Sequence, residues 1–283
     1  MIRLAVRCEP ELAERVLAEL VELVPGGVEE ERGEGYVEYA IYGPPGELPE
    51  LPEIEVAAGD GLVEIETTVI PDDWADRWRD FHEPVWVGQR LVVRPSWEPG
   101  VGIDPSTAGS PIEIVIDPGQ AFGTGAHATT AMCLELLLEH ADGDGRRGAV
   151  SDLGTGSGVL AIAAAKLGFG PVRAFDHELP AVEAATANAE LNGVAVSVER
   201  LNLRERPAPG ASLWLANLTA PLLVAVADSL ASGPRPRALV LSGLLASERR
   251  RVIDAFGARG YAAAGERRRG DWAALRLLDP QRS

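Results

Sequence analysis

The sequence predicts an α/β protein with a doubly wound, mainly parallel sheet, preceded by a smaller α+β domain. Three observations lead to this prediction. From about Ile112 onward, short apolar runs alternate with segments of helical periodicity, as they do in repeated βα units. A glycine-rich turn, residues 154–158, connects one predicted strand to the next predicted helix. The first 70 residues instead follow a β-α-β-β-α-β order.

Residues 1–70 are predicted to form a ferredoxin-like domain. Alternating or strand-like patterns indicate four strands, at 2–8, 28–32, 36–42 and 62–70. Apolar residues recur at helical spacing over 12–23, and Pro25-Gly26-Gly27 ends that helix. A second helix is expected within 46–60, although Pro49 and Pro52 weaken the helical pattern there.

Residues 71–84 are predicted to form a linker helix. Asp72 suits a helix start, and Trp74, Trp78 and Phe81 recur at the spacing that places them on one helix face. This aromatic stripe favours a packing seam over a ligand site, because large aromatic side chains contribute most of their energy by burial.

The remaining segment, 85–283, is assigned to the larger α/β domain. Strands are expected at 85–95, 149–153, 172–176, 194–199, 213–217 and 238–241, and helices at 129–140, 158–167, 179–191, 221–230 and 246–258. Because strands and helices alternate, the sheet is predicted to be mainly parallel. Two late strands, 261–267 and 272–277, have no helix between them and are predicted to pair antiparallel.

Charge and composition narrow the class of partner. The 283 residues carry a net charge of −17, and residues 1–70 alone contain 17 acidic and 4 basic residues, a net charge of −13. A strongly acidic domain repels nucleic acid, and it either steers a cationic partner or simply keeps the surface solvated. We therefore expect no direct contact with nucleic acid. No apolar run is long enough to span a membrane. The oligomeric state stays open, with a monomer as the simplest expectation.

Two cysteines, Cys8 and Cys133, lie far apart in the sequence. Their number excludes a disulfide framework and a cysteine zinc site, and it fits the reducing cytoplasm, where we expect the protein to be. His127 has no second ligand at metal spacing, so no metal site is predicted.

The glycine-rich turn is the central functional signal. Asp152 precedes glycines at positions 154, 156 and 158. Glycines let the backbone approach a ligand closely, and a helix N-terminus favours negative groups. A dinucleotide site would read G-x-G-x-x-G, but Val159 stands where its third glycine would be. The observed spacing resembles motif I of class I methyltransferases. The alternative is a tight strand–helix turn without a ligand.

Two polar residues close neighbouring strands. Asp176 lies 22 residues after Gly154, at a position where a carboxylate reaches the ribose hydroxyls of a cofactor. Asn217 ends the 213–217 strand, and its side chain offers both a donor and an acceptor. It could hold a substrate amine, or the amino and carboxylate end of a cofactor. For both residues the alternative is a helix cap.

A glycine-rich polar stretch, residues 117–130, lies about 25 residues before the glycine-rich turn. Such a loop could fold over a cofactor as a lid.

Together these motifs resemble the ribosomal protein L11 methyltransferase family. The resemblance rests on residues 117–130, 152–168, 185–193, 216–218 and 242–248, and it covers the chain from about Thr68 to the end. It implies a Rossmann-like class I methyltransferase domain behind a ferredoxin-like substrate-recognition domain. It also implies transfer of methyl groups from S-adenosylmethionine to lysine and N-terminal amino groups of ribosomal protein L11.

The resemblance implies the site residues as well. The cofactor-binding residues would be Thr130, Gly154, Gly156, Asp176 and Asn217, with Phe122, Gly123 and Thr124 nearby in the loop. Asn217 is also the candidate catalytic residue, because with nearby carbonyls it could accept amine hydrogens and orient the nucleophile. No dedicated general base stands out. The sequence departs from the family pattern at His177, where an apolar residue is more frequent, and at Ala128, where proline is common.

Three alternatives stay open. The same chemistry could act on another protein lysine or on a small molecule. A nicotinamide-dependent oxidoreductase is disfavoured by the glycine spacing and Val159. A non-catalytic binding protein that kept the nucleotide fold is disfavoured by the intact set of predicted contacts.

Overall fold

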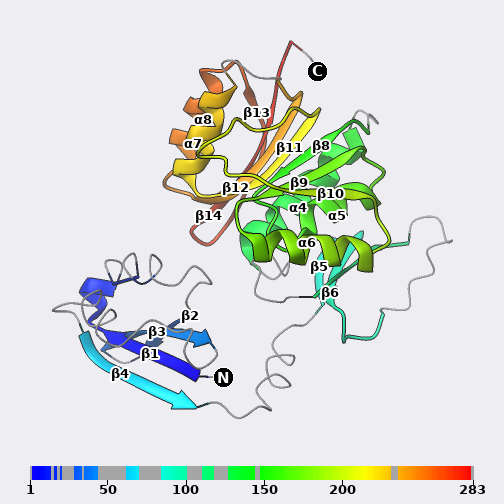
Figure 1. Ribbon diagram of the computed structural model, residues 1–283. Helices are drawn as coiled ribbons and strands as arrows, with labels where there is room; N and C mark the ends of the chain where they lie inside the picture. The colour runs from blue at the N-terminus through cyan, green and yellow to red at the C-terminus, as the bar shows by residue number, and fades with distance from the viewer. Residues whose placement is uncertain are drawn as a thin grey trace. The chain divides into compact units, whose positions relative to one another are not determined.

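Two units make up the chain in the computed structural model, Met1–Phe81 and His82–Ser283 (Figure 1). The residues described are 2–13, 16–17, 20, 29–33, 35–43, 62–69, 84–100, 110–117, 127–143, 147–230 and 235–281. Each unit has its own sheet and its own hydrophobic core. The predicted linker helix at 71–84 lies almost entirely outside the described residues.

The first unit contains a four-stranded antiparallel sheet in the order β2-β3-β1-β4. Its strands are β1 (Ile2–Cys8), β2 (Glu29–Gly33), β3 (Tyr36–Gly43) and β4 (Leu62–Val69). All four strands were predicted. After β1 comes a short 3-10 helix, η1 (Pro10–Leu12), followed by helical residues at 13, 16, 17 and 20. The second predicted helix, at 46–60, lies outside the described residues, so the complete ferredoxin-like assignment stays a prediction.

One face of this sheet is apolar and the other is charged. Leu4, Val6 and Cys8 pack into a core with Val16 and Leu20.

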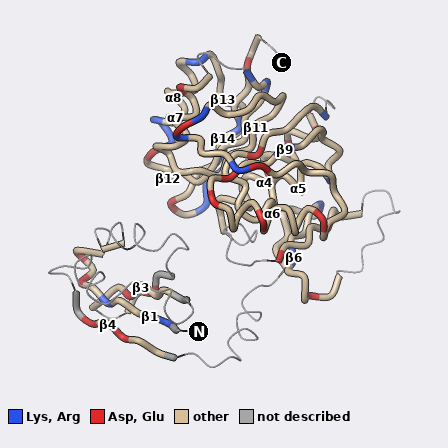
Figure 2. The backbone as a smooth tube through the Cα atoms, in the orientation of Figure 1, with Lys and Arg blue, Asp and Glu red and all other residues tan. Residues whose placement is uncertain are grey.

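On the opposite face, Arg3 bonds to Glu38, and Arg7 Nε lies 2.6 Å from a Glu38 oxygen. Burial would raise the pKa of Glu38, but the hydrogen bonds from both arginines outweigh burial and lower it. Arg7 also reaches Glu64 at 2.5 Å and Glu66 at 3.2 Å. Strands β3 and β4 carry the glutamates Glu38, Glu64 and Glu66 and no lysine or arginine (Figure 2).

The second unit is built around a seven-stranded sheet in the order β10-β9-β8-β11-β12-β14-β13. Its strands are β8 (Val150–Leu153), β9 (Val172–Asp176), β10 (Val196–Arg200), β11 (Leu213–Asn217), β12 (Ala238–Leu245), β13 (Ala262–Arg269) and β14 (Trp272–Leu278). Strands β8 to β12 pair in parallel, and β14 is antiparallel to both β12 and β13. The doubly wound sheet and the antiparallel final pair are thus confirmed. When β8 to β14 are counted as strands 1 to 7, the order of this sheet is 3-2-1-4-5-7-6. A dinucleotide-binding sheet has the order 3-2-1-4-5-6, without the antiparallel strand that is inserted here.

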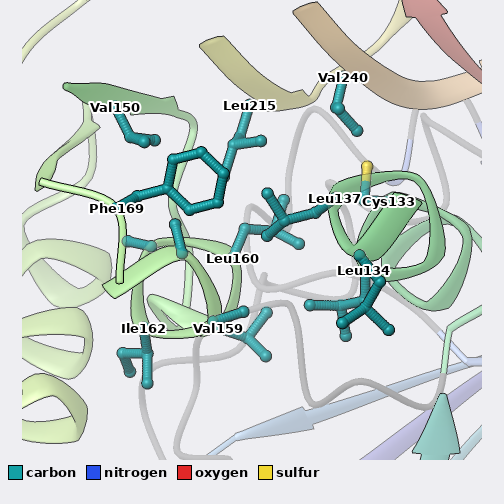
Figure 3. Close-up of a cluster of buried hydrophobic side chains, with 14 of the residues drawn as sticks. Cys133, Leu134, Leu137, Val150, Val159, Leu160, Ile162, Phe169, Leu215 and Val240 are labelled. Atoms are coloured by element: carbon teal, nitrogen blue, oxygen red, sulfur yellow. The ribbon is translucent and has the colours of Figure 1, made fainter. Parts of the chain in front are cut away.

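Helices cover both faces of this sheet. They are α4 (Ala128–Gly143), α5 (Val159–Lys166), α6 (Leu179–Leu191), α7 (Ala220–Ser229) and α8 (Arg249–Gly257). In Figure 1, α7 and α8 lie on one side and α4, α5 and α6 on the other. Figure 3 shows Leu137 of α4 and Leu160 of α5 packed near Val150, Leu215 and Val240 of the strands. Among the described helices, none is long and apolar enough to cross a bilayer.

A separate three-stranded sheet was not predicted. It consists of β5 (Val85–Val87), β6 (Leu91–Pro95) and β7 (Ile112–Ile116), in that order. The apolar run 85–95 forms two strands rather than one, because it turns at Gly88, whose φ is +58°. β7 pairs in parallel with β6 and does not join the larger sheet.

Two asparagines, Asn188 of α6 and Asn192 at its C-cap, tie β7 to the larger α/β layer. Val115 donates its N–H to Asn192 Oδ1 at 2.9 Å, and Asn192 Nδ2 donates back to the Val115 carbonyl at 2.6 Å. Asn188, only 1% exposed, accepts the Asp117 N–H at 2.8 Å and donates to the Ser157 carbonyl at 2.9 Å. Asn188 therefore connects the end of β7 to the glycine-rich turn.

Replacing this connection should destabilise the second unit. We expect Asn188→Ala to lower the free energy of unfolding by about 2 kcal/mol, because buried backbone groups lose their partners. Thr186→Ala, at an exposed position of the same helix, should change it by less than about 0.5 kcal/mol. Denaturant unfolding of the two variants measures both values. Equal decreases in the free energy of unfolding for the two substitutions would contradict the role of Asn188 in connecting β7 to the glycine-rich turn.

Candidate active site

Five side chains at the carboxyl edge of the seven-stranded sheet point to the same face. Side chains alternate along a strand, and Val150, Leu215 and Val240 belong to the core beneath α4, so residues two positions further along face the same way. Asn217 lies beside Ser242, and Leu215 lies beside Asp152. We define the edge row as Asp176, Asp152, Asn217, Ser242 and Trp272, from strands β9, β8, β11, β12 and β14.

The glycine-rich turn requires glycine for conformational reasons. Gly154, Gly156 and Gly158 have φ values of +71°, +53° and +86°, in the left-handed region that other residues avoid. A Cβ on Gly154 would lie 2.3 Å from Leu218 Cδ2, and a Cβ on Gly158 would lie 3.1 Å from the Ala185 Cα. The same glycines thus form a tight turn and keep the backbone accessible beside β11. The turn and ligand interpretations are compatible.

Asp152 holds the two ends of this turn together. One carboxylate oxygen, Oδ2, accepts the Thr155 hydroxyl at 2.7 Å and the Ala161 N–H, in the first turn of α5, at 3.1 Å. The other oxygen, Oδ1, is buried and has no hydrogen-bond partner among the described residues. Burial raises the pKa of Asp152 to about 7, although both hydrogen bonds oppose this shift. This carboxyl group therefore holds its proton far more readily than an exposed aspartate does.

Asp176 closes β9 and borders a cavity. Its Oδ2 accepts the Gly156 N–H at 3.0 Å and its Oδ1 accepts the Glu178 N–H at 3.2 Å. Since Glu178 is the N-cap residue of α6, the simple helix-cap interpretation of Asp176 is wrong. An open pocket lies here, lined by Gly154, Asp176, His177, Leu201, Asn202, Leu203, Arg204, Leu218 and Leu222. Its leucines offer an apolar surface and its polar side chains offer hydrogen-bonding groups, a combination that suits a nucleoside.

Asn217 is joined to the N-terminal turn of α4. Its Nδ2 donates to the Thr130 hydroxyl at 3.3 Å, so two predicted contacts from distant parts of the chain meet. Its Oδ1 is buried and has no hydrogen-bond partner in the described part of the chain. The N-cap residue of α7 is Thr219, so Asn217 is not a helix cap either.

The first turns of α4 cover the far end of the edge row. The His127 ring meets the Trp272 ring edge to face, with centroids 5.1 Å apart and planes at 73°. His127 Nδ1 also lies 2.7 Å from the Thr129 hydroxyl. Burial lowers the pKa of His127, so the imidazole is neutral at pH 7.

The structure brings five of the predicted site residues to one edge: Thr130, Gly154, Gly156, Asp176 and Asn217. Phe122, Gly123 and Thr124 lie outside the described residues. The sequence reasoning missed the supporting role of Asn188 and the position of Trp272. Asn188 was a usable signal, because asparagine is a weak helix former and its place inside α6 needs another explanation.

The residues at this edge fit an adenosyl cofactor with a cationic end. Asp176 offers acceptors for ribose hydroxyls beside the apolar cavity walls. The unpartnered oxygens of Asp152 and Asn217 are buried acceptors, which require either a donor or bound water to offset their desolvation.

Gly154→Ala tests the contact between the turn and β11. We expect a loss of more than about 2 kcal/mol in the free energy of unfolding, from left-handed backbone strain and the clash with Leu218. The affinity for S-adenosylhomocysteine should fall roughly tenfold or more, which calorimetric titration measures. Gly168→Ala is the control, because φ is +83° there and nothing lies within 4 Å of an added Cβ. The Gly168→Ala substitution should lower the free energy of unfolding only by the backbone strain of about 1–2 kcal/mol. A similar loss of S-adenosylhomocysteine affinity in both variants would refute the assignment of Gly154 to the cofactor site.

Comparison with known proteins identifies the family. The family model described as ribosomal protein L11 methyltransferase (PrmA) matches residues 49–279. The ribosomal protein L11 methyltransferase of Pelotomaculum thermopropionicum is 42% identical over 211 residues, 74% of this chain and 66% of that protein. The corresponding protein of Geotalea uraniireducens is 40% identical over 223 residues, 74% of this chain and 68% of that one. The alignments thus span about two thirds of the length of these curated relatives.

A crystal structure of ribosomal protein L11 methylase from Lactobacillus delbrueckii subsp. bulgaricus is similar as well. It is 29% identical and superimposes with a TM-score of 0.61, covering 70% of this chain and 99% of that chain. The family model alone matches more than half of the chain and includes the whole edge row. The chain therefore belongs to the ribosomal protein L11 methyltransferase family.

Proposed function

We propose that this protein transfers methyl groups from S-adenosylmethionine to lysine and N-terminal amino groups of ribosomal protein L11. The observation that carries the proposal is the family match over residues 49–279, within which the edge row forms one continuous site. Ribosomal proteins are made and assembled in the cytoplasm, and we place the reaction there. Both cysteines are buried, which is compatible with that compartment.

The residues of the edge row would hold the cofactor in an extended arrangement. Asp176 would accept the ribose hydroxyls, and the turn at Gly154 and Gly156 would bring backbone close to the cofactor. The buried Oδ1 of Asp152 would take its ammonium end. Asn217, bonded to Thr130, would border the cofactor and keep its own buried Oδ1 for the acceptor amine. Bound S-adenosylmethionine supplies an electrophilic methyl group on a sulfonium.

The protein must then present a neutral amine. Lysine has a reference pKa of about 10.4, and burial in an apolar site lowers it because the charged form is desolvated. The Asn217 Oδ1 atom would accept one amine N–H and so orient the nitrogen lone pair. Orientation of this kind contributes up to roughly 7–11 kcal/mol in the best intramolecular reactions.

The activity can be tested directly. Purified protein, S-adenosylmethionine and ribosomal protein L11 from the same genome should give L11 with added methyl groups on lysine and the N-terminal amine, detected by mass spectrometry. Methylation of other proteins but not L11 would contradict the proposed substrate, and cofactor binding without methylation of any protein would contradict the proposed activity.

Two variants separate the roles within the site. Asp176→Asn should weaken S-adenosylhomocysteine binding by about 10- to 100-fold, because hydrogen bonds to a charged group are lost. Asn217→Ala should lower kcat by about 100-fold or more, because an orienting acceptor is lost. Full turnover in Asn217→Ala would remove the proposed catalytic role of this residue.

The acidic first unit is proposed to recruit the basic protein substrate. Glu64 and Glu66 are exposed on the charged face of its sheet, and Glu31 is exposed on the neighbouring edge strand β2. Arg7 lies beside Glu64 and Glu66 but is also bonded to Glu38, so acidic groups outnumber basic ones on this face. Long-range attraction of this kind raises the rate of encounter and weakens with salt.

Neutralising this face should weaken recruitment. We expect Glu64→Gln combined with Glu66→Gln to raise the KM for the protein substrate by roughly 2- to 10-fold at low salt, and to reduce its dependence on ionic strength. Glu183→Gln combined with Glu190→Gln, at exposed positions of α6, is the matched control and should leave both unchanged. Equal effects of the two pairs would show that net charge alone, and not this face, is responsible.

A further inference from the structure

The edge row continues beyond the residues that would hold the cofactor. Asp176, Asp152 and Asn217 occupy β9, β8 and β11, and the next strands in the sheet are β12 and β14. Their contributions to the row are Ser242 and Trp272. Since the residues proposed to hold the cofactor lie on β9, β8 and β11, the part of the row on β12 and β14 is left for the methyl acceptor.

Two small residues of β12, Ser242 and Gly243, follow Asn217 across the sheet towards β14. Ser242 lies beside Asn217, and its hydroxyl donates to the Ala273 carbonyl at 2.9 Å. Gly243 follows with φ +81°, and a Cβ there would lie 2.6 Å from the Leu218 carbonyl oxygen. In the antiparallel pair of β12 and β14, Trp272 lies opposite Leu245, three residues beyond Ser242. At the backbone Trp272 is therefore more than two strand spacings, over about 10 Å, from Asn217. The indole ring and the alkyl chain of the ammonium ligand would together span that distance.

Trp272 is held in place by its neighbours. It is only partly buried, packs on the core beneath α4, and meets the His127 ring edge to face. His127 is the residue just before α4, three positions from Thr130, which bonds to Asn217. One helical turn therefore fixes both the aromatic pair and the Asn217 contact.

The local electrostatics suit a cation. His127 is neutral at pH 7 because burial lowers its pKa. Two arginines of the adjoining strand β13, Arg267 and Arg269, are bonded to Glu135 and Glu139 of α4, so acidic groups match their charge. An ammonium group near the Trp272 face would thus meet an aromatic ring without an uncompensated positive charge.

The geometry points to the His127–Trp272 pair as the binding site for the acceptor alkylammonium, including its methylated forms, with the Trp272 face as the principal contact. This inference rests on the proposed methylation of amino groups. Aromatic faces attract quaternary ammonium groups without hydrogen bonds, so a nitrogen that has already gained methyl groups would still bind.

The experiment observes Trp272 directly in protein saturated with S-adenosylhomocysteine. The six tryptophans give indole N–H signals in nitrogen-15 spectra, and Trp272→Phe identifies the signal of Trp272 by its loss. The probe is Nα-acetyl-trimethyllysine amide, and the control ligand replaces its trimethylammonium group with a neutral tert-butyl group. We expect the Trp272 signal to shift saturably with the charged probe and to show about 3- to 30-fold weaker binding of the neutral one. The signal of Trp86, an exposed tryptophan of β5, should not move.

Kinetics provide the second measurement. Trp272→Leu should raise the KM for the protein substrate and shift products towards fewer methyl groups, with S-adenosylhomocysteine affinity unchanged. Trp272→Phe, which keeps an aromatic ring, should have a KM and a degree of methylation close to those of the unaltered protein. Trp86→Leu is the matched control and should behave as the unaltered protein.

The outcomes separate this inference from the proposed function. A charge-dependent shift at Trp272 without methylation of L11 would support the ammonium site and overturn the proposed protein substrate. Methylation of L11 with no Trp272 shift, or with equal binding of both ligands, would overturn the ammonium site. A parallel loss of cofactor affinity in Trp272→Leu would also overturn it, because the residue would then support the cofactor.

Discussion

The parallel register of β9, β8, β11 and β12 is the constraint on which the functional site depends. Because Leu215 lies beside Asp152 and Asn217 beside Ser242, residues far apart in sequence end on one face of one edge. A slip of one residue in any of these strands would turn its polar group to the opposite face, into the core formed with α7 and α8. The buried residues that precede each polar group therefore fix the position of the site as much as the polar groups do.

Much of the fold follows from local pattern. Strands β9 and β11 and helix α6 have the predicted bounds, because each is a strongly periodic segment between clear turn residues. The three-stranded sheet could not be predicted in this way. β6 and β7 pair across a long intervening segment, and nothing within either strand specifies that partner. The tie between β7 and α6 through Asn188 and Asn192 is equally non-local, although the two asparagines are visible in the sequence.

For the site, the sequence identifies residues whose chemistry is unusual for their position. Asp176 and Asn217 close apolar strands, and the glycines occupy a turn that requires positive φ. Both capping alternatives were wrong for the same reason: the N-cap residues of the two helices stand two positions later, at Glu178 and Thr219. Trp272 could not be assigned from sequence, since an aromatic residue that begins a strand looks like any core residue until its place beside His127 is known.

The distribution of charge makes physical sense for a reaction between a sulfonium cofactor and an amine that arrives as an ammonium ion. Carboxylates attract an ammonium substrate, but a carboxylate next to the reacting nitrogen would also hold its proton and raise its pKa. In this chain the surplus of acidic groups lies in the first unit, whereas burial raises the pKa of Asp152 and Asp176 is engaged by backbone amides. A neutral aromatic pair at the acceptor end would contact the alkyl groups and the diffuse positive charge of the ammonium. It would not accept a hydrogen bond that holds a particular N–H proton on the nitrogen. Binding and deprotonation, which oppose each other in a site rich in carboxylates, could then proceed on the same surface.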